Sequence, residues 1–284
     1  NAGMLPVIII AYEWFFFQDL RISFSRKQIL GIIGVAAVFS AIALLYLGGD
    51  PLERILNAYT RRDFTLAERV MTEWRVVIYY ITLLFYPHPG RLILDHHYPL
   101  SASMAQPATT LPALAAIICL AGLAVYLSRQ HRFLSFCLLW FLANLVIESS
   151  VIGIEIIYEH RTYLPFMFLV AAGVYLALTR IRAPKMTVAG LSIVALVFSV
   201  WAYQRNTIWE SRVDFWADNA RKAPNDFRPH NDLGVAYYDA GRVDAAIHHY
   251  QKALALEPDH PDTLNNLGNA FKRKGHMQRA LDCY

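Results

Sequence analysis

Long apolar runs in residues 1–204 constrain the fold of this 284-residue chain more than any other feature. The run from Ile29 to Gly48 has about 20 residues, enough to cross a hydrocarbon core about 30 Å thick as an α-helix. Hydrophobic residues make up 56% of the sequence, and residues 205–284 contain no such run. The sequence therefore predicts a membrane protein with a soluble helical tail.

We expect residues 1–204 to form a polytopic transmembrane helical bundle. The predicted spans lie near residues 4–17, 29–48, 108–128, 133–152, 163–179 and 186–204. The apolar stretch Val76–Tyr86 has only 11 residues, so a helix near 70–86 is predicted to be interfacial or re-entrant. Because the chain opens on Asn1 at the edge of an apolar run, we expect a fragment that lacks N-terminal spans.

The basic residues predict an orientation in the membrane. The loops 18–28, 128–132 and 180–185 are short and basic, which indicates the cytoplasmic side. All three share that side only if Val76–Tyr86 does not cross the membrane, and the arginines of residues 49–75, nearly matched by acids, count against placing that region outside. The region 49–107, the loop after the 133–152 span and the tail would then face outward. This distribution favours a lipid bilayer as the partner of the basic residues and argues against nucleic acid.

A 34-residue repeat in the tail is the most specific signal in the sequence. The matching positions are Leu233, Gly234, Tyr237, Gly241, Ala246 and Tyr250, followed by Leu267, Gly268, Phe271, Gly275, Ala280 and Tyr284. This period is the signature of tetratricopeptide repeats, which are helix–turn–helix units stacked into an α-solenoid. We expect an all-α chain with a linker and degenerate repeat helix at 205–226, one repeat at 227–260 and a truncated repeat at 261–284.

Stacked repeats form a concave groove that suits an extended peptide or a partner protein. Asn231 and Asn265 occupy equivalent positions on the first helices of the two repeats. They are candidate partner-binding residues, and the alternative is that both are solvated polar residues.

The segment between the spans 133–152 and 163–179 contains Glu159, His160 and Arg161 side by side. Charges beside membrane spans are costly to place, and arginine binds phosphate bidentately. These three residues are therefore substrate-binding candidates. The alternative is that a short interfacial loop is polar because it meets the headgroups.

A proline-punctuated loop at residues 87–99 supplies two further substrate-binding candidates, Arg91 and Asp95, which could contact a phosphate or a sugar. His88, His96 and His97 lie nearby, but their spacing matches no standard zinc pattern. No metal site is therefore predicted. The sequence also contains no Ser-His-Asp arrangement, phosphate-cradling glycine loop or zinc-protease helix.

Three features together resemble the TMTC family of transmembrane and tetratricopeptide-repeat proteins, which are related to polytopic glycosyltransferases of the GT-C fold. They are the run Glu159–Pro165 between two spans, the stretch Pro87–Asp95, and repeats after the last span. The sequence is more similar to a bacterial relative than to an animal one. Phe166 follows the proline where relatives often have serine, so details of that site are expected to differ.

The resemblance implies a membrane glycosyltransferase that transfers a hexose, mannose in animals, from a polyprenyl-phosphate donor to a protein acceptor. In a bacterium, the enzyme would lie in the inner membrane with its repeats in the periplasm. The family's main catalytic acid lies in a first exterior loop that is not in this sequence, so the catalytic residues are unknown. Carried over to this chain, Arg161 contacts the donor phosphate and Glu159 orients it. The resemblance implies no cofactor within the fragment and allows a divalent cation in the complete enzyme.

Two other functions are consistent with the same features. A non-catalytic, membrane-anchored scaffold could use the repeats to recruit envelope protein complexes. Part of a transporter or flippase could also combine apolar spans with polar loops. A carboxylate pair in the first exterior loop of the complete protein would favour the enzyme over both.

Overall fold

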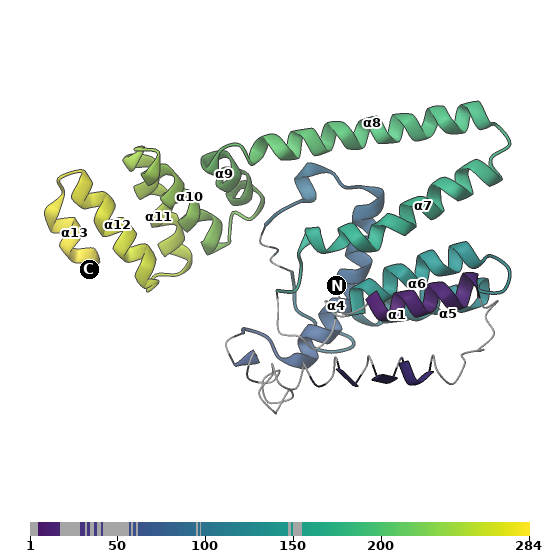
Figure 1. Cartoon of the computed structure of the whole chain (residues 1–284). Helices are drawn as coiled ribbons and strands as arrows, with labels where there is room; N and C mark the ends of the chain where they lie inside the picture. Colours follow the sequence, from purple (N-terminus) through teal and green to yellow (C-terminus); the bar gives the residue numbers. More distant parts are fainter. Residues whose placement is uncertain are drawn as a thin grey trace. The chain divides into compact units, whose positions relative to one another are not determined.

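The computed structural model describes residues 5–17, 29–31, 33–34, 37–38, 41, 57, 59–60, 62–94, 96, 98–146, 149 and 155–284. Within these residues the chain is all-α, which confirms the predicted fold class (Figure 1). The chain divides into two compact units. We call Asn1–Tyr86 with Tyr98–Leu191 the apolar unit, and Pro87–His97 with Ser192–Tyr284 the repeat unit.

The apolar unit is built from helices with long apolar runs. Its described α-helices are α1 (Leu5–Phe16), α4 (Leu66–Phe85), α5 (Thr110–Leu127), α6 (Arg132–Val146) and α7 (Tyr163–Arg180), followed by the first part of α8 (Pro184–Ile208). Three helical stretches among the described residues are long and apolar enough to cross a membrane, namely Thr110–Leu127, Glu159–Arg180 and Pro184–Ile208. Membrane association follows from their length and composition.

These three stretches coincide with the predicted spans 108–128, 163–179 and 186–204. The helix α6 ends at Val146, before the end of the predicted span 133–152, whose last residues lie largely outside the described part of the chain. Most of the predicted span 29–48 also lies outside it. Membrane crossing by these two segments therefore stays a prediction.

The helix α4 begins with a capping box. The Thr65 hydroxyl accepts a hydrogen bond from the Glu68 backbone N–H, and the Glu68 carboxylate accepts one from the Thr65 backbone N–H. This arrangement satisfies two N–H groups that otherwise lack partners at a helix start. The helix thus starts four residues before the predicted 70–86, and it is not among the three stretches that could cross a membrane.

Aromatic and polar contacts join the helices of the apolar unit. The Trp140 indole of α6 donates a hydrogen bond to the Leu164 carbonyl at 2.8 Å, and its ring lies 4.5 Å from that of Phe168 in α7. The Ser135 hydroxyl of α6 donates to the Ala124 carbonyl of α5 at 2.6 Å. These contacts connect α5, α6 and α7 in sequence order.

The repeat unit continues from α8 into a stack of short helices. They are α9 (Arg212–Lys222), α10 (Phe227–Asp239), α11 (Val243–Leu256), α12 (Pro261–Arg273) and α13 (Met277–Cys283). Each helix packs against the next one, so α10 with α11 and α12 with α13 form the two predicted helix–turn–helix units. The helix α9 lies within the segment 205–226, where a degenerate repeat helix was expected.

Glycines at matching positions explain the 34-residue period. An added Cβ at Gly234 would lie 2.6 Å from the Tyr250 ring, and one at Gly268 would lie 2.8 Å from the Tyr284 ring. Gly241 adopts a φ of 75° in the turn between α10 and α11, a backbone conformation that favours glycine. Close approach and turn geometry thus account for the repeated small residues.

Candidate functional site

A group of charged side chains lies where α4 meets the segment before α7 in the apolar unit. We call Arg62, Arg69, Glu73, Glu155 and Arg161 the arginine cluster. Arg62 pairs with Glu155, and Arg69 pairs with Glu73 at 2.9 Å. The cluster joins two segments that are far apart in sequence, so tertiary folding brings these charges together.

The segment that carries the predicted candidates folds as a short 3₁₀ helix, η3 (Glu159–Thr162), directly before α7. The Thr162 hydroxyl donates to the Glu159 carbonyl at 2.6 Å, which closes this turn. The Tyr80 hydroxyl of α4 bonds to both the backbone N–H and the carbonyl of Tyr158, at 3.1 and 3.2 Å. Because Tyr80 is buried, these two bonds fix the start of η3 to α4.

Arg161 is held in a defined orientation. Its Nη1 donates to the Glu155 carbonyl at 2.7 Å, and its guanidinium lies 4.7 Å from the centre of the Tyr158 ring. A planar guanidinium matches the geometry of phosphate, and here the Tyr158 ring and the Glu155 carbonyl fix its direction. The side chain is half-buried, while His160 beside it is exposed and its ring lies 5.2 Å from that of Tyr158.

Arg69 and Glu73 form a fully buried ion pair, with 0% and 1% of their side chains exposed. Burial lowers the pKa of the Arg69 guanidinium, and the Glu73 carboxylate opposes this shift. The positive charges of Arg161 and Arg62 lower the Arg69 pKa further, so the three guanidinium groups lie within electrostatic range of one another. Concentrating like charges in this way is costly, and such arrangements are typical of functional sites.

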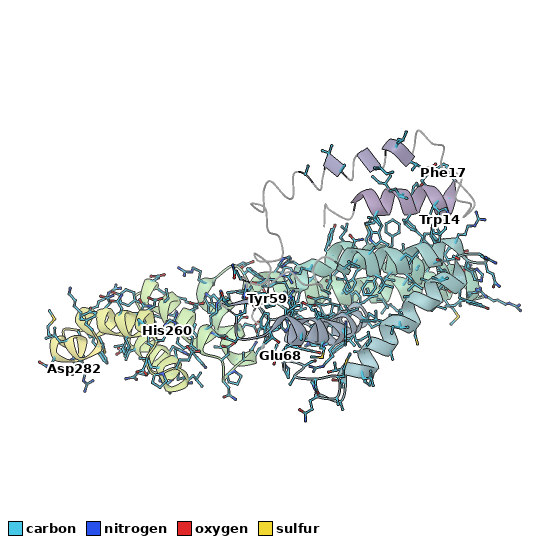
Figure 2. All side chains as sticks on the ribbon, turned by 90° about the horizontal axis from the view of Figure 1, so that it is seen from below. Trp14, Phe17, Tyr59, Glu68, His260 and Asp282 are labelled. Carbon is cyan, nitrogen blue, oxygen red and sulfur yellow. The ribbon has the colours of Figure 1, made fainter. Side chains whose placement is uncertain are left out.

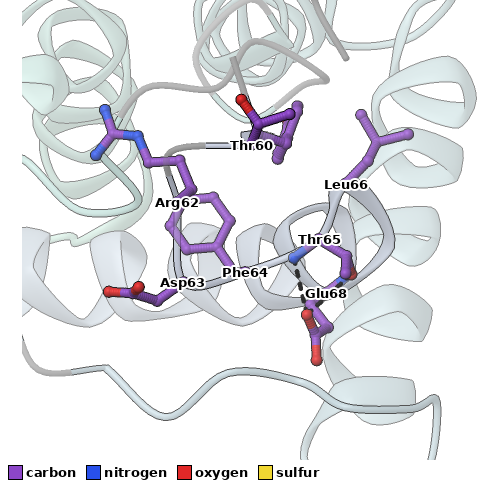
Figure 3. A pocket seen from close by; sticks show the side chains of 8 residues that line it. Thr60, Arg62, Asp63, Phe64, Thr65, Leu66 and Glu68 are labelled. Atoms are coloured by element: carbon purple, nitrogen blue, oxygen red, sulfur yellow. Dashed lines mark hydrogen bonds between the residues drawn. The ribbon is translucent and has the colours of Figure 1, made fainter. Parts of the chain in front are cut away.

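An open pocket of about 530 Å³ lies beside the arginine cluster at the start of α4 (Figure 3). Its lining includes Arg62, Phe64 and Leu66, together with Tyr59 and Glu68, which are also labelled in Figure 2. The lining therefore combines apolar surface with charged groups of both signs. Such a mixture suits an amphipathic ligand that carries a polar head.

Of the remaining substrate-binding candidates, Arg91 lies in the repeat unit. Arg91 belongs to the 3₁₀ helix η2 (Pro89–Arg91), which His88 caps by accepting a hydrogen bond from the Gly90 N–H at 3.0 Å. Asp95 lies outside the described residues. Glu159, His160 and Arg161 thus share one short helix of the apolar unit, whereas Arg91 lies in the other compact unit.

The two asparagine candidates differ in their surroundings. The side-chain Oδ1 of Asn231 accepts a hydrogen bond from the Thr263 hydroxyl of α12 at 2.9 Å, so Asn231 links the two repeats. Asn265 is exposed on α12. Asn265 is therefore the better placed of the two for a partner, and the partner-binding role of both stays a prediction.

The described residues contain no group of three or more His, Cys, Asp or Glu side chains that could hold a metal ion. The divalent cation that the resemblance allows stays a prediction.

Several residues of the site escaped the sequence analysis, namely Arg62, Arg69, Glu73, Tyr80 and Glu155. Arg62, Arg69 and Glu73 lie in the stretch 49–75, where arginines are nearly matched in number by acids. The spacing of Arg69 and Glu73 by four residues predicts an ion pair on one helix face, but it does not predict burial.

Comparison with known proteins identifies the repeats and a partial similarity. The family model described as "TPR repeat" matches residues 234–275. The Mus musculus "Protein O-mannosyl-transferase TMTC1" is 34% identical over 84 residues, which cover 30% of this chain and 9% of that protein. The Homo sapiens "Protein O-mannosyl-transferase TMTC3" is 25% identical over 132 residues, which cover 45% of this chain and 14% of that protein.

Among solved structures, the chain called "MamA MSR-1 C2" aligns with 59% of this chain and 92% of its own length, at 18% identity and a TM-score of 0.27. An overlap this weak carries no argument about function. The mannosyl-transferase matches span less than a sixth of those proteins. The chain is therefore a helical, membrane-associated protein with tetratricopeptide repeats that is similar, over part of its length, to TMTC proteins.

Proposed function

We propose that this chain is part of an integral membrane glycosyltransferase of the GT-C type. In this proposal it uses a polyprenyl-phosphate hexose, mannose or a similar sugar, as the donor and a protein hydroxyl as the acceptor. The single observation that carries the proposal is the oriented Arg161 within the arginine cluster. The partial similarity to O-mannosyl-transferases supports it.

Arg161 would act on the leaving group. In the transfer, the acceptor oxygen forms a bond to the anomeric carbon, and the bond between that carbon and the phosphate oxygen breaks. The lipid phosphate leaves with an additional negative charge, and the acceptor proton passes to a base. A guanidinium already fixed by Tyr158 and the Glu155 carbonyl stabilises this developing charge without reorganising.

The other residues of the chain receive supporting roles. Tyr80 holds η3 in place through the Tyr158 backbone, and the Glu159 backbone carbonyl closes the turn by accepting from the Thr162 hydroxyl. The Glu159 side chain is proposed to have an orienting role. Arg91 and Asp95 are proposed to contact the sugar or phosphate, and His160 lies exposed beside Arg161. The repeats would bind the protein acceptor. The proposal assigns the catalytic acid to no residue of this chain and leaves a divalent cation to the complete enzyme.

The test uses the complete protein in membranes with a radiolabelled polyprenyl-phosphate sugar. We expect Arg161→Ala to lower transfer on the order of a hundredfold or more, because a preorganised charge donor at the leaving group is removed. Arg180→Ala is the matched control, since Arg180 is exposed at the other end of α7. Transfer that survives Arg161→Ala unchanged would reject the phosphate role.

A membrane-anchored scaffold is the second candidate, and the repeat match at 234–275 favours it. The complete wild-type protein would then show no transfer from any polyprenyl-phosphate sugar, while its repeats still bound an envelope protein. An absence of transfer from wild-type membranes would therefore favour the scaffold over the enzyme.

Orientation needs a separate measurement. The proposal places the repeats in the periplasm of a bacterial inner membrane. A cysteine introduced at Glu257, an exposed residue at the end of α11, reports the side when the three native cysteines are replaced by serine. We expect labelling of intact cells by an impermeant reagent, and labelling only after the cytoplasm is opened would reverse the topology.

A further inference from the structure

The loop Pro87–Leu94, which we call the Arg91 loop, is hydrogen-bonded to the helix α9. Both segments belong to the repeat unit, although they are more than 120 residues apart in the chain, as in the bond between Leu94 and Asn219. The loop follows α4 directly in sequence. Its partners nevertheless come from the helix that starts the repeat stack.

Lys222, in the last turn of α9, makes the first contact. Its Nζ donates to the carbonyls of Pro89 and Leu92, both at 2.7 Å, and to the Asp218 carboxylate at 2.5 Å. A lysine ammonium has three N–H donors, so these three acceptors match its capacity. Only 12% of the Lys222 side chain is exposed, which makes this an enclosed contact.

Asn219 makes the second contact, one turn earlier on α9. Its Oδ1 accepts a hydrogen bond from the Leu94 backbone N–H at 2.9 Å. Its Nδ2 donates to the Phe215 carbonyl at 2.8 Å, which fixes the direction of the amide. Since Asn219 is only 1% exposed, the bond to the loop is shielded from competition by water.

Two further features stabilise the contact. Asp218, which is 5% exposed, also pairs with Arg205 of α8 at 3.1 Å and with Arg221 at 2.5 Å. The His88 ring of the loop lies 5.3 Å from the Trp201 ring of α8, edge to face. The loop is therefore bound at both ends by the α8–α9 pair.

We propose that Lys222 and Asn219 are positioning residues that make the Arg91 loop a fixed part of the repeat unit. This rests on the proposed function, in which the repeats bind the acceptor and Arg91 contacts the sugar or phosphate. An acceptor protein seated on the repeats is then presented at a constant distance from Arg91. Because Arg91 contacts the donor, loosening the loop raises the KM for the polyprenyl-phosphate sugar more than it lowers kcat.

The experiment combines a structural and a kinetic measurement on the complete protein in membranes. Lys222→Met keeps the volume of the side chain but removes all three donors. Arg221→Met is the matched control, because Arg221 pairs with the same Asp218 but is 76% exposed and makes no described bond to the loop. Asn219→Leu is a second variant that removes the acceptor of the Leu94 N–H.

The structural measurement is hydrogen exchange of the amides of residues 90–94. We expect exchange to accelerate about tenfold or more in Lys222→Met and in Asn219→Leu, and to be unchanged in Arg221→Met. The kinetic measurement is the KM for the polyprenyl-phosphate sugar, expected to rise several-fold in the same two variants. Normal exchange from α10 and α11 shows that the repeats remain folded.

The outcomes separate the two proposals. Unchanged exchange of residues 90–94 in Lys222→Met and Asn219→Leu overturns the positioning role, and so does faster exchange with an unchanged KM. Wild-type protein that transfers no sugar overturns the proposed function instead. The positioning role is supported if Lys222→Met and Asn219→Leu both show faster exchange and a raised KM while Arg221→Met shows neither change.

Discussion

The two compact units use their small and polar residues in opposite ways. In the repeat unit, Gly234 faces the Tyr250 ring so closely that an added Cβ would lie 2.6 Å from it. In the apolar unit, an added Cβ at Gly122, Gly173 or Gly190 would meet no atom within 4 Å. Side-chain contacts within the chain thus specify the repeats, whereas the apolar helices leave much of their surface for other apolar material such as lipid.

Individual ion pairs differ in burial within the units as well as between them, since the Lys222–Asp218 pair of the repeat unit is only 12% and 5% exposed. The Arg69–Glu73 pair of the apolar unit is fully buried, while the Arg212–Asp239 pair between α9 and α10 is 67% and 53% exposed. The desolvation free energy of a buried ion pair is larger than that of an exposed pair. A buried ion pair adds little net stability. The position of the Arg69–Glu73 pair within electrostatic range of Arg161 therefore supports the proposed site.

The largest expected effect comes from breaking the buried pair. Glu73→Ala removes the carboxylate beside a fully buried guanidinium, and we expect it to lower the free energy of unfolding by about 3–5 kcal/mol. The measurement is denaturant titration of the detergent-solubilised complete protein. Glu68→Ala is the control on the same helix, where loss of the capping box costs about 1 kcal/mol. Equal losses in the two variants would show that the buried pair contributes no more to stability than the capping box.

The next effect tests the contrast between glycines. Gly234→Ala forces the Tyr250 ring to move, and we expect a loss of about 1–3 kcal/mol in the free energy of unfolding of the repeats. Gly122→Ala in α5 meets open space and improves helix propensity by up to about 1 kcal/mol, so no loss is expected there. Hydrogen exchange of α10 and α5 in the same preparation measures both. A larger loss in α5 would reverse the comparison.

The repeats were predictable from sequence because the residues that pack against one another recur with a fixed period. The period that relates Gly234 and Tyr250 to Gly268 and Tyr284 is visible without long-range information, and α10 to α13 follow it. The apolar helices α5, α7 and α8 were predictable for a similar reason, since length and apolar composition suffice. The role of Asn231 was less accessible, because its bond to Thr263 depends on how the repeats stack.

The site was predictable only in part. The Glu159–Arg161 run was visible as charge between apolar runs, but its partners were not. Arg62 meets Glu155 across 93 residues, and Lys222 meets the Pro89 carbonyl across 133. No local pattern distinguishes the buried Arg69 from the less buried Arg62 and Arg75, so tertiary packing decides how deeply each one lies.

A pH change should affect the repeats through His249. Burial lowers the pKa of His249 to about 4, and the nearby His230, His248 and Lys252 act in the same direction. The unfolded chain, with an ordinary histidine pKa near 6.5, then binds more protons than the folded one below that pH. We expect the repeats to lose about 1–2 kcal/mol of stability as the pH falls from about 6.5 toward 4, the partial exposure of the ring keeping the loss below the full shift.

The measurement is urea unfolding of the repeats in the complete protein at pH 7.5 and pH 5. Unfolding is monitored by amide hydrogen exchange, corrected for the intrinsic exchange rate at each pH. His249→Phe should remove most of the difference between the two pH values. His276→Asn, which changes an exposed histidine at the start of α13, should retain it. A pH dependence that persists in His249→Phe would assign the effect to other groups.

The smallest expected effect belongs to the exposed pair. Arg212 Nη1 lies 2.8 Å from Asp239 Oδ2, but water screens both groups and two flexible side chains must be held in place. We therefore expect Asp239→Asn to change the free energy of unfolding by about 0.5 kcal/mol or less at physiological salt, and by less still at 1 M salt. Denaturant titration at the two salt concentrations measures this. A loss comparable to that of Glu73→Ala would mean that ion pairing stabilises both units alike, and the buried Arg69–Glu73 pair would then no longer distinguish the region around Arg161 as a site.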